Sequence, residues 1–266
     1  MNATAPPDLG TLACYVYGIV PSRTRVPDGL EGVGDPPAPV SLVKHHRIAA
    51  VVSEIDTRRP LGTPTDLLAH ARVLDTLAAA RCAVLPFRFG AVVGDVEEVA
   101  DDLLAPQERR FLTALEDLTD LAQFTVRGTY RQEWVLRRIL GRREDIARLR
   151  EQTAALPADA ARHQNIQLGE LVSQELVSCG RADTTRVLEA LSPLAAVTLD
   201  DPATADQAVN VSFLVPSDRW DEFEGVVEDL AGRWEGQIEL RLLGPLAAYD
   251  FVSQAVDAQG GGPPWE

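Results

Sequence analysis

The chain has 266 residues, of which 45% are apolar, and it carries 40 acidic against 25 basic side chains, a formal net charge of −15. This length holds one large domain or two of roughly 100–150 residues each, and the apolar fraction excludes an intrinsically disordered chain. Because so acidic a surface repels phosphate backbones and anionic lipid, we predict no nucleic-acid partner and no membrane partner.

The three cysteines, Cys14, Cys82 and Cys179, lie far apart within apolar patterns. They form neither a zinc-binding spacing nor a disulfide framework, which is typical of a reducing cytoplasm. We find no secretory signal at the N-terminus and no apolar run near the ~20 residues of a membrane helix. We therefore predict a soluble cytoplasmic protein, with a disordered N-terminus over residues 1–12 and a flexible, glycine- and proline-rich tail over residues 253–266.

The first half predicts a smaller α+β domain over residues 13–120. Thr63-Pro64-Thr65-Asp66 is a typical helix start, with a hydroxyl at the N-cap, proline at the first position and an acid three residues after the cap. The expected apolar stripe of this helix is Leu67, Ala71, Leu74, Leu77 and Ala78. The expected strands lie at about 13–20, 40–44, 48–55 and 83–93, and a second helical stretch at 95–120 is interrupted at Pro106.

The second half predicts a domain over residues 121–252. Apolar and polar residues alternate from Phe124 to Arg131, which indicates a strand with one polar face. The further expected elements are helices at about 133–156, 160–195 and 217–234 and strands at 197–199, 208–215 and 237–243. We expect the strands at 197–199 and 208–215 to pair around the Asp200-Asp201-Pro202 turn. One face of the 217–234 helix carries the apolar residues Trp220, Phe223, Val227, Leu230 and Trp234. The order strand, helix, strand, strand, helix, strand is that of the ferredoxin-like split βαβ arrangement, here with an enlarged first helical crossover. We predict an antiparallel four-stranded sheet with helices on one face.

No nucleotide loop or nucleophile motif stands out. Gly29, Gly32 and Gly34 lie in a loop that lacks the strand, helix and lysine of a phosphate-binding loop. The acids of 97–102 and 221–224 fall in early turns of predicted helices, where the helix dipole favours negative charge. The sequence predicts a protein that is not an enzyme, with no catalytic residues, no cofactor and no small-molecule substrate.

The four histidines are the remaining candidates for a metal site or a base. His45 and His46 adjoin in a predicted hairpin turn, and neighbouring strand positions point to opposite faces, so such a pair seldom shares a metal. His70 is expected on the polar flank of its helix, without the partner of a zinc-binding helix motif, and no role is assigned to His163. We predict no metal site.

Residues 84–90 read Val-Leu-Pro-Phe-Arg-Phe-Gly. Proline belongs at a strand edge, start or bulge, yet Pro86 stands beside the alternating aromatics Phe87 and Phe89. Two interpretations stay open: core packing at a bulged strand, which we favour, or an edge that binds a partner.

The last predicted strand runs into Gly244-Pro245 and then Tyr249-Asp250-Phe251-Val252. Because proline donates no N–H, we expect the Gly-Pro pair to break the ladder and the chain to turn a corner. Tyr249 and Phe251 then lie on one side of an extended segment and anchor it. The candidate structural or interaction residues are Pro86, Phe87, Phe89, Gly244, Pro245, Tyr249 and Phe251.

These segments together resemble the gas vesicle protein family GvpL/GvpF. The ending is similar to the family's strand, Gly-Pro, short link and Tyr-x-Phe-Val, although the link here is Leu246-Ala247-Ala248 where the family is often richer in Trp and Pro. The central 84–90 segment is similar to its Leu-Pro-x-x-Phe-Gly. Further matching strands, in the family's order, lie at 15–20, 49–54 and 210–215.

The resemblance implies a non-catalytic structural or assembly protein of gas vesicles. Such a protein is a minor vesicle component that contacts the main shell protein and other gas vesicle proteins and supports vesicle nucleation or formation, in the cytoplasm and on the vesicle. The alternative is a ligand-binding regulatory module with a ferredoxin-like domain, which rests on the predicted fold alone.

Overall fold

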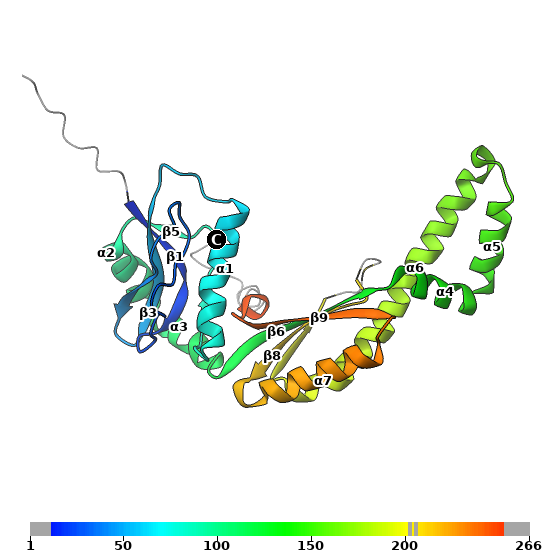
Figure 1. Cartoon of the computed structure of the whole chain (residues 1–266). Helices are drawn as coiled ribbons and strands as arrows, with labels where there is room; N and C mark the ends of the chain where they lie inside the picture. Colours follow the sequence, from blue (N-terminus) through cyan, green and yellow to red (C-terminus); the bar gives the residue numbers. More distant parts are fainter. Residues whose placement is uncertain (1–11, 202–203, 205–206, 253–266) are drawn as a thin grey trace, which may run out of the picture. The chain divides into compact units, whose positions relative to one another are not determined.

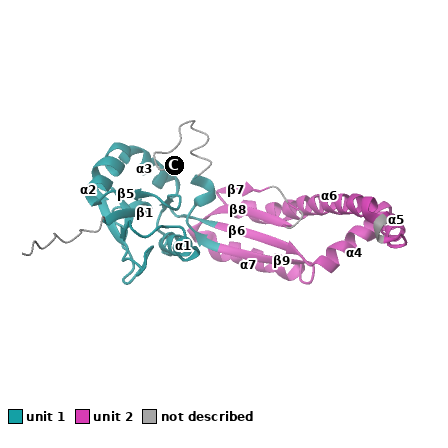
Figure 2. Ribbon diagram, turned by 90° about the horizontal axis from the view of Figure 1, so that it is seen from above, with its two compact units in different colours: residues 1–123, 244–266 teal, residues 124–243 magenta. Residues whose placement is uncertain are grey.

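The computed structural model describes residues 12–252 except 202–203 and 205–206, without the side chains of 158–159. The predicted tail over 253–266 and all but the last residue of the predicted N-terminal segment lie outside the described residues. The chain divides into two compact units, one of residues 1–123 and 244–266 and the other of residues 124–243 (Figure 2).

Unit 1 contains an antiparallel sheet of five strands in the order β2-β3-β1-β4, with β5 also paired to β1. Figure 1 labels β1, β3 and β5 of this sheet. The strands are β1 (Leu12–Pro21), β2 (Ser41–His45), β3 (Ile48–Asp56), β4 (Leu85–Pro86) and β5 (Val92–Val93). The register of β1 shifts between Val16 and Gly18. A Cβ at Gly18 would collide with the Leu85 carbonyl oxygen, so only glycine admits β4 at this distance.

The single strand predicted over 83–93 is wrong, because the structure contains two two-residue pairings in its place. Pro86 has no N–H to extend the ladder, and Gly90 adopts a φ of 100°, which turns the chain between β4 and β5. The Phe87 N–H still donates to the Tyr17 carbonyl, at 2.9 Å, just beyond β4.

The helices of unit 1 are α1 (Pro64–Ala79), α2 (Val96–Glu98), the π-helical η1 (Val99–Leu104) and α3 (Ala105–Asp117). The helical stretch predicted over 95–120 is interrupted just before Pro106, where the π-helical η1 ends at Leu104. Pro106 itself lies in the first turn of α3. The predicted apolar stripe of α1 is confirmed at Leu74, Leu77 and Ala78, which are buried, but not at Leu67, which is 48% exposed. The buried face also includes Asp66, His70 and Val73, which the stripe omits.

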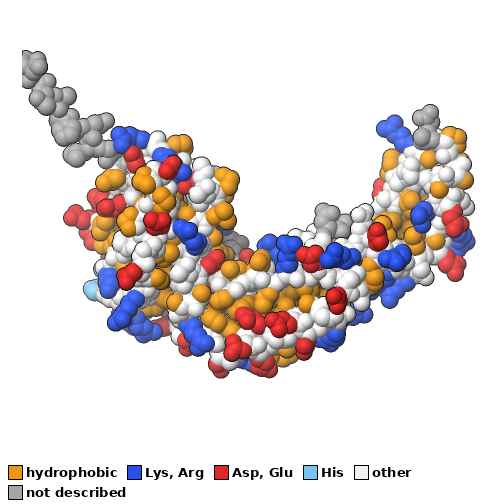
Figure 3. All heavy atoms as spheres, in the orientation of Figure 1, with side chains coloured by type: hydrophobic (Ala, Val, Ile, Leu, Met, Phe, Trp, Pro, Cys, Tyr) orange, Lys and Arg blue, Asp and Glu red, His pale blue; other side chains and the backbone are white. Residues whose placement is uncertain are grey.

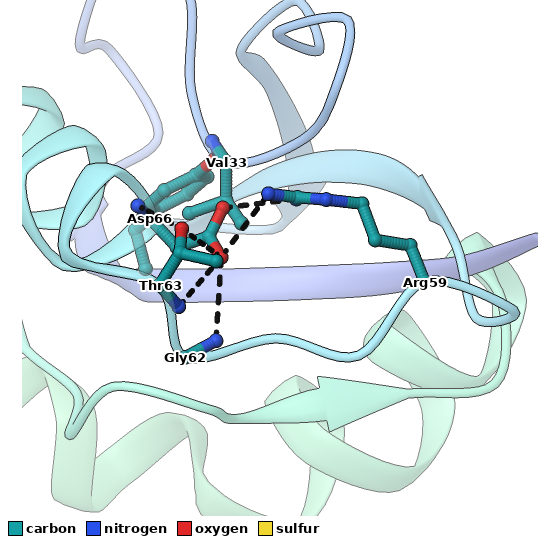
Figure 4. A network of polar contacts seen from close by, with 6 residues as sticks. Val33, Arg59, Gly62, Thr63 and Asp66 are labelled. Carbon is teal, nitrogen blue, oxygen red and sulfur yellow. Dashed lines mark hydrogen bonds and ion pairs between the residues drawn. The ribbon is translucent and has the colours of Figure 1, made fainter.

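The predicted start of α1 is confirmed. The Asp66 N–H donates to the Thr63 Oγ1 at 3.2 Å, and the Thr63 N–H donates to the Asp66 carboxylate at 3.1 Å, which completes a capping box. Gly62 N–H and the Arg59 guanidinium also donate to this carboxylate (Figure 4). Burial of Asp66 acts to raise its pKa, but these hydrogen bonds outweigh it and hold the pKa below its usual value.

Unit 2 and the strand ends that lead into it hold an antiparallel sheet in the order β7-β8-β6-β9. The strands are β6 (Leu121–Tyr130), β7 (Val197–Asp200), β8 (Val209–Pro216) and β9 (Ile238–Leu246). Its helices are α4 (Gln132–Arg142), α5 (Glu144–Ala154), α6 (Ala158–Leu191) and α7 (Trp220–Arg233), with short 3₁₀ turns at Ser192–Leu194 and Ser217–Arg219. The predicted pairing of the strands around the Asp200-Asp201-Pro202 turn is confirmed.

The core of this sheet is aromatic. Phe223 on α7 packs against Phe213 and Phe124, with ring centroids 5.2 and 5.4 Å apart, and all three side chains are fully buried. Val227 and Leu230 continue the same buried face of α7 at helical spacing, as the sequence predicts.

Candidate functional site

The aromatic cluster of unit 1, defined here as Tyr15, His70, Phe89 and Tyr249, joins the two segments that the sequence singles out. The His70 ring lies 5.7 Å from Tyr15, 5.7 Å from Phe89 and 6.3 Å from Tyr249, measured between centroids. Phe89 comes from the 84–90 segment and Tyr249 from the chain's end. Both segments pack against the core formed by β1, β3 and α1.

His70 does not lie on the polar flank of its helix, as predicted; it is 4% exposed. Its Nδ1 lies 2.8 Å from the Tyr15 hydroxyl and its Nε2 lies 3.2 Å from the Phe87 carbonyl oxygen. Because a carbonyl only accepts, Nε2 carries the proton and Nδ1 accepts from Tyr15. Burial lowers the pKa of His70 to about 4, so the ring is neutral at pH 7. With both nitrogens engaged, this histidine is a structural group.

The tyrosines of β1 extend this buried network. The Tyr15 hydroxyl accepts from the Gly90 N–H at 3.1 Å. The Tyr17 hydroxyl accepts from the Val33 N–H at 2.7 Å and donates to the Ser53 hydroxyl at 2.9 Å. Burial raises the pKa of both phenols, so they stay neutral and act as hydrogen-bonding groups that hold the loop before β2 and the turn after β4 onto the sheet.

The candidate residues of the 84–90 segment are placed mainly inside. Pro86 and Phe87 are buried, and the Phe87 ring packs 6.1 Å from Phe111 of α3. Phe89 is half-buried against Tyr15 and His70. This placement agrees with the core-packing interpretation of the segment.

The end of the chain differs from the predicted corner. β9 continues through Gly244 and Pro245 to Leu246, so the pair does not end the strand. Gly244 has a φ of 153°, which glycine adopts without a Cβ penalty. Residues 249–252 are helical, not extended. Because two residues on a helix are about 200° apart, Tyr249 and Phe251 do not lie on one side.

Polar contacts fasten this end to unit 1. The Ala247 N–H donates to the Asp75 carboxylate of α1 at 3.0 Å. The Gln123 amide donates to the Asp250 carboxylate at 2.6 Å, and its oxygen accepts from the Asp250 N–H at 3.1 Å. Burial raises the pKa of Asp75, against the opposing effect of its bond from Ala247. We call residues 247–252 the C-terminal clasp.

Sequence reasoning missed a second grouping, at the hairpin between β2 and β3. The predicted turn is confirmed, because His45 pairs with Ile48 and His46 and Arg47 form the turn. His46 Nδ1 lies 3.2 Å from the Glu108 carboxylate on α3. Because Glu108 is 62 residues from His46 in the sequence, no local sequence pattern could predict this contact.

Unit 2 contains a hollow of about 500 Å³ between α4, α5 and α6. Its lining is mainly aliphatic, with Glu133, Arg137 and Arg150 at its polar positions. A separate buried carboxylate, Asp183, accepts from Tyr130, Arg138 and Arg186 at 2.6, 3.1 and 2.8 Å. A large apolar pocket with convergent polar groups would favour the ligand-binding alternative, but this hollow is lined by helices and not by the paired sheets between which ferredoxin-like domains often bind ligands.

Comparison with known proteins places the chain among gas vesicle proteins. Gas vesicle protein F of Streptomyces sp. (strain CB03234) is 33% identical over 91% of this chain and 100% of its own length. Gas vesicle protein F of Dolichospermum flosaquae is 25% identical over 91% of this chain and 98% of its own length. A crystal structure of GvpF from Anabaena sp. PCC7120 superposes with a TM-score of 0.71 at 25% identity, covering 90% of this chain and 98% of that one.

The family model "Gas vesicle synthesis protein GvpL/GvpF" matches residues 13–253. The chain therefore belongs to the GvpL/GvpF family, as the sequence motifs predict, and is a gas vesicle associated protein. Among the described residues, no helix is both long and apolar enough to cross a membrane.

Proposed function

We propose that this protein is a non-catalytic structural and assembly protein of gas vesicles. It is a minor vesicle component that contacts the main shell protein, and other gas vesicle proteins, and supports vesicle nucleation or formation, in the cytoplasm and on the vesicle. The observation that carries the proposal is the family match over residues 13–253, together with a relative named gas vesicle protein F that the chain covers over its full length.

The placement of the reactive side chains supports a non-catalytic role. The buried imidazole of His70 has both nitrogens hydrogen-bonded. The buried carboxylates of Asp66 and Asp183 accept from arginines and hydroxyl groups of their own surroundings. These groups stabilise the fold, and a catalytic acid or base needs a free proton-transfer position facing a substrate.

The surface charge supports protein partners over nucleic acid. Although the net charge is −15, acidic and basic side chains are interspersed over the face in Figure 3. A nucleic-acid site requires a continuous basic stripe along one element or face. Protein contact requires no such stripe.

The strand order of the second sheet supports a ferredoxin-like domain that begins near residue 121. Its four strands follow in the order β7-β8-β6-β9, with α4 to α6 between β6 and β7 and with α7 between β8 and β9. This is the split βαβ arrangement with an enlarged first crossover. The candidate residues Pro86, Phe87, Phe89, Gly244, Pro245, Tyr249 and Phe251 have, in this proposal, a structural role in unit 1.

The test is capture of the main shell protein of the same gene cluster by the full chain. We expect co-purification of the shell protein, and loss of vesicles on gene deletion that the intact gene restores. A chain ending at Asp257 should restore vesicles as well, whereas a chain ending at Leu243, without the clasp, should not. No capture together with normal vesicles in the deletion strain would refute the proposal.

A further inference from the structure

The β2–β3 hairpin brings its two histidines to the same side of the turn. Consecutive strand residues point to opposite faces, which is why the sequence argues against a shared ligand. His46, however, lies outside the strand, in the turn, with a φ of 47°. This left-handed conformation redirects its side chain, so the two imidazole rings lie 4.3 Å apart between centroids, at an angle of 43°.

α3 supplies a third group. Glu108, in the first turn of α3, places its carboxylate 3.2 Å from His46 Nδ1. One ligand atom from each of His45, His46 and Glu108 lies within 4.8 Å of the other two. Glu108 is the more sheltered partner, with 25% of its side chain exposed against 71% for His46. The remaining charge of the turn, Arg47, lies 3.6 Å from Glu116 of the same helix.

This spacing fits a transition-metal cation. Zinc binds imidazole nitrogen and carboxylate oxygen at about 2.0–2.2 Å, which separates neighbouring ligand atoms by roughly 3–3.5 Å in a tetrahedral or octahedral arrangement. The His46–Glu108 distance of 3.2 Å already has this value, and a ligand atom of the half-buried His45 lies within 4.8 Å of both. Two imidazoles and one carboxylate favour zinc, nickel or copper over magnesium and calcium, which prefer oxygen ligands alone.

We propose that His45, His46 and Glu108 form a binding site for a divalent transition metal of the zinc type. The three side chains occupy three positions, and water or a group from a partner protein fills a fourth. Because the ligands come from the β2–β3 turn and from α3, the bound ion links two elements of unit 1. A simple ion pair between His46 and Glu108 is the competing interpretation, and it gives His45 no part.

The test is zinc titration of the full-length, untagged chain by calorimetry, with His45→Gln, His46→Asn and Glu108→Gln variants. Asparagine is chosen at position 46 because it tolerates positive φ. We expect one zinc per chain and at least a tenfold loss of affinity in each variant. His163→Gln, which removes an exposed imidazole of α6, is the matched control and should keep the affinity of the unmodified chain.

Melting of the metal-free variants serves as a check of folding, and each should melt within a few degrees of the unmodified chain. Zinc should raise the melting temperature of the unmodified chain and of the His163→Gln variant, but not that of the three site variants. Absence of saturable binding would overturn the proposal. So would unchanged affinity in His45→Gln, which would leave only the ion pair, or equal loss in the His163→Gln control.

Discussion

Unit 1 places its histidines in two opposite environments. His70 is buried among Tyr15, Phe89 and Tyr249, and both its nitrogens are hydrogen-bonded within the protein. His45 and His46 stand at a hairpin turn, half-buried and exposed, with a carboxylate of α3 beside them. The neutral His70 ring stabilises the core through packing and hydrogen bonds. The rings of His45 and His46 remain accessible to a ligand from outside the protein.

The difference follows from what covers each site. His70 is covered by the 84–90 segment and by the C-terminal clasp, which reaches it from the far end of the sequence. Nothing comparable covers the hairpin in the described part of unit 1, where His46 is 71% exposed. The two segments that resemble family motifs, residues 84–90 and the clasp, therefore meet at the buried His70. Changes to these segments should lower the stability of the core around His70 and leave the hairpin histidines unaffected.

Removal of the clasp should have the largest effect. A chain ending at Leu243 loses the last three residues of β9 and the Tyr249 packing, and it uncovers His70. It also removes the bonds that Ala247 and Asp250 make to Asp75 and Gln123. We expect a loss on the order of 5 kcal/mol in the free energy of unfolding, measured by urea titration. A chain ending at Asp257 should match the full chain. Equal stability of the two shortened chains would show that the clasp does not brace unit 1.

Truncating Phe87 should rank next. Its side chain is 1% exposed and packs on Phe111, so Phe87→Ala should cost about 3–5 kcal/mol. Phe89→Ala, at a half-buried ring, should cost less, on the order of 1–2 kcal/mol. Chemical denaturation of both variants measures the two losses in the free energy of unfolding. A smaller loss for Phe87→Ala than for Phe89→Ala would contradict the core-packing interpretation of Phe87.

The pH dependence of stability should report on His70. Its pKa is lowered to about 4 in the folded protein, from 6.5, so the unfolded chain takes up the proton first. The contribution of neutral His70 to the free energy of unfolding is therefore fully present above about pH 6.5 and is lost as the pH drops toward 4. Between pH 7 and 4.5, the unmodified chain should lose about 2–3 kcal/mol more than His70→Gln does.

His163→Gln is the control for this pH experiment, because it removes an exposed imidazole and should keep the full acid sensitivity. Urea titrations at both pH values give the comparison. Parallel pH profiles for the unmodified chain and His70→Gln would mean that His70 does not carry the sensitivity.

The hairpin histidines should give the smallest effect on stability. With no added metal, the double variant His45→Gln/His46→Asn should unfold within about 0.5 kcal/mol of the unmodified chain, since His46 lies in an exposed turn and His45 is the half-buried last residue of β2. Vesicle formation should also stay close to normal. Loss of vesicles with intact folding would show that the turn has a required function.

Local sequence signals predicted the local structure well. The Thr63–Asp66 cap and the buried face of α7 depend on residues a few positions apart, and β7 and β8 are consecutive strands. Their spacing alone encodes them, since capping and helical periodicity act over one to three turns.

Long-range contacts explain what the sequence missed. The surroundings of His70 come from distant residues: Tyr15, 55 residues away, donates to its Nδ1, and the Phe87 carbonyl, 17 residues away, accepts from its Nε2. Glu108 reaches His46 across 62 residues. The helical turn at 249–252 was mistaken for an extended segment because four residues are too few to separate the two periods.

The most direct test of the account is a paired measurement on Phe251→Ala: the melting temperature and the amount of main shell protein captured per folded molecule. Phe251 is half-buried in the clasp, so we predict a lower melting temperature, with a cost of about 1–2 kcal/mol, and capture per folded molecule close to that of the unmodified chain. An unchanged melting temperature with capture lost would contradict the account, because the aromatic ending would then be a contact surface for the shell protein.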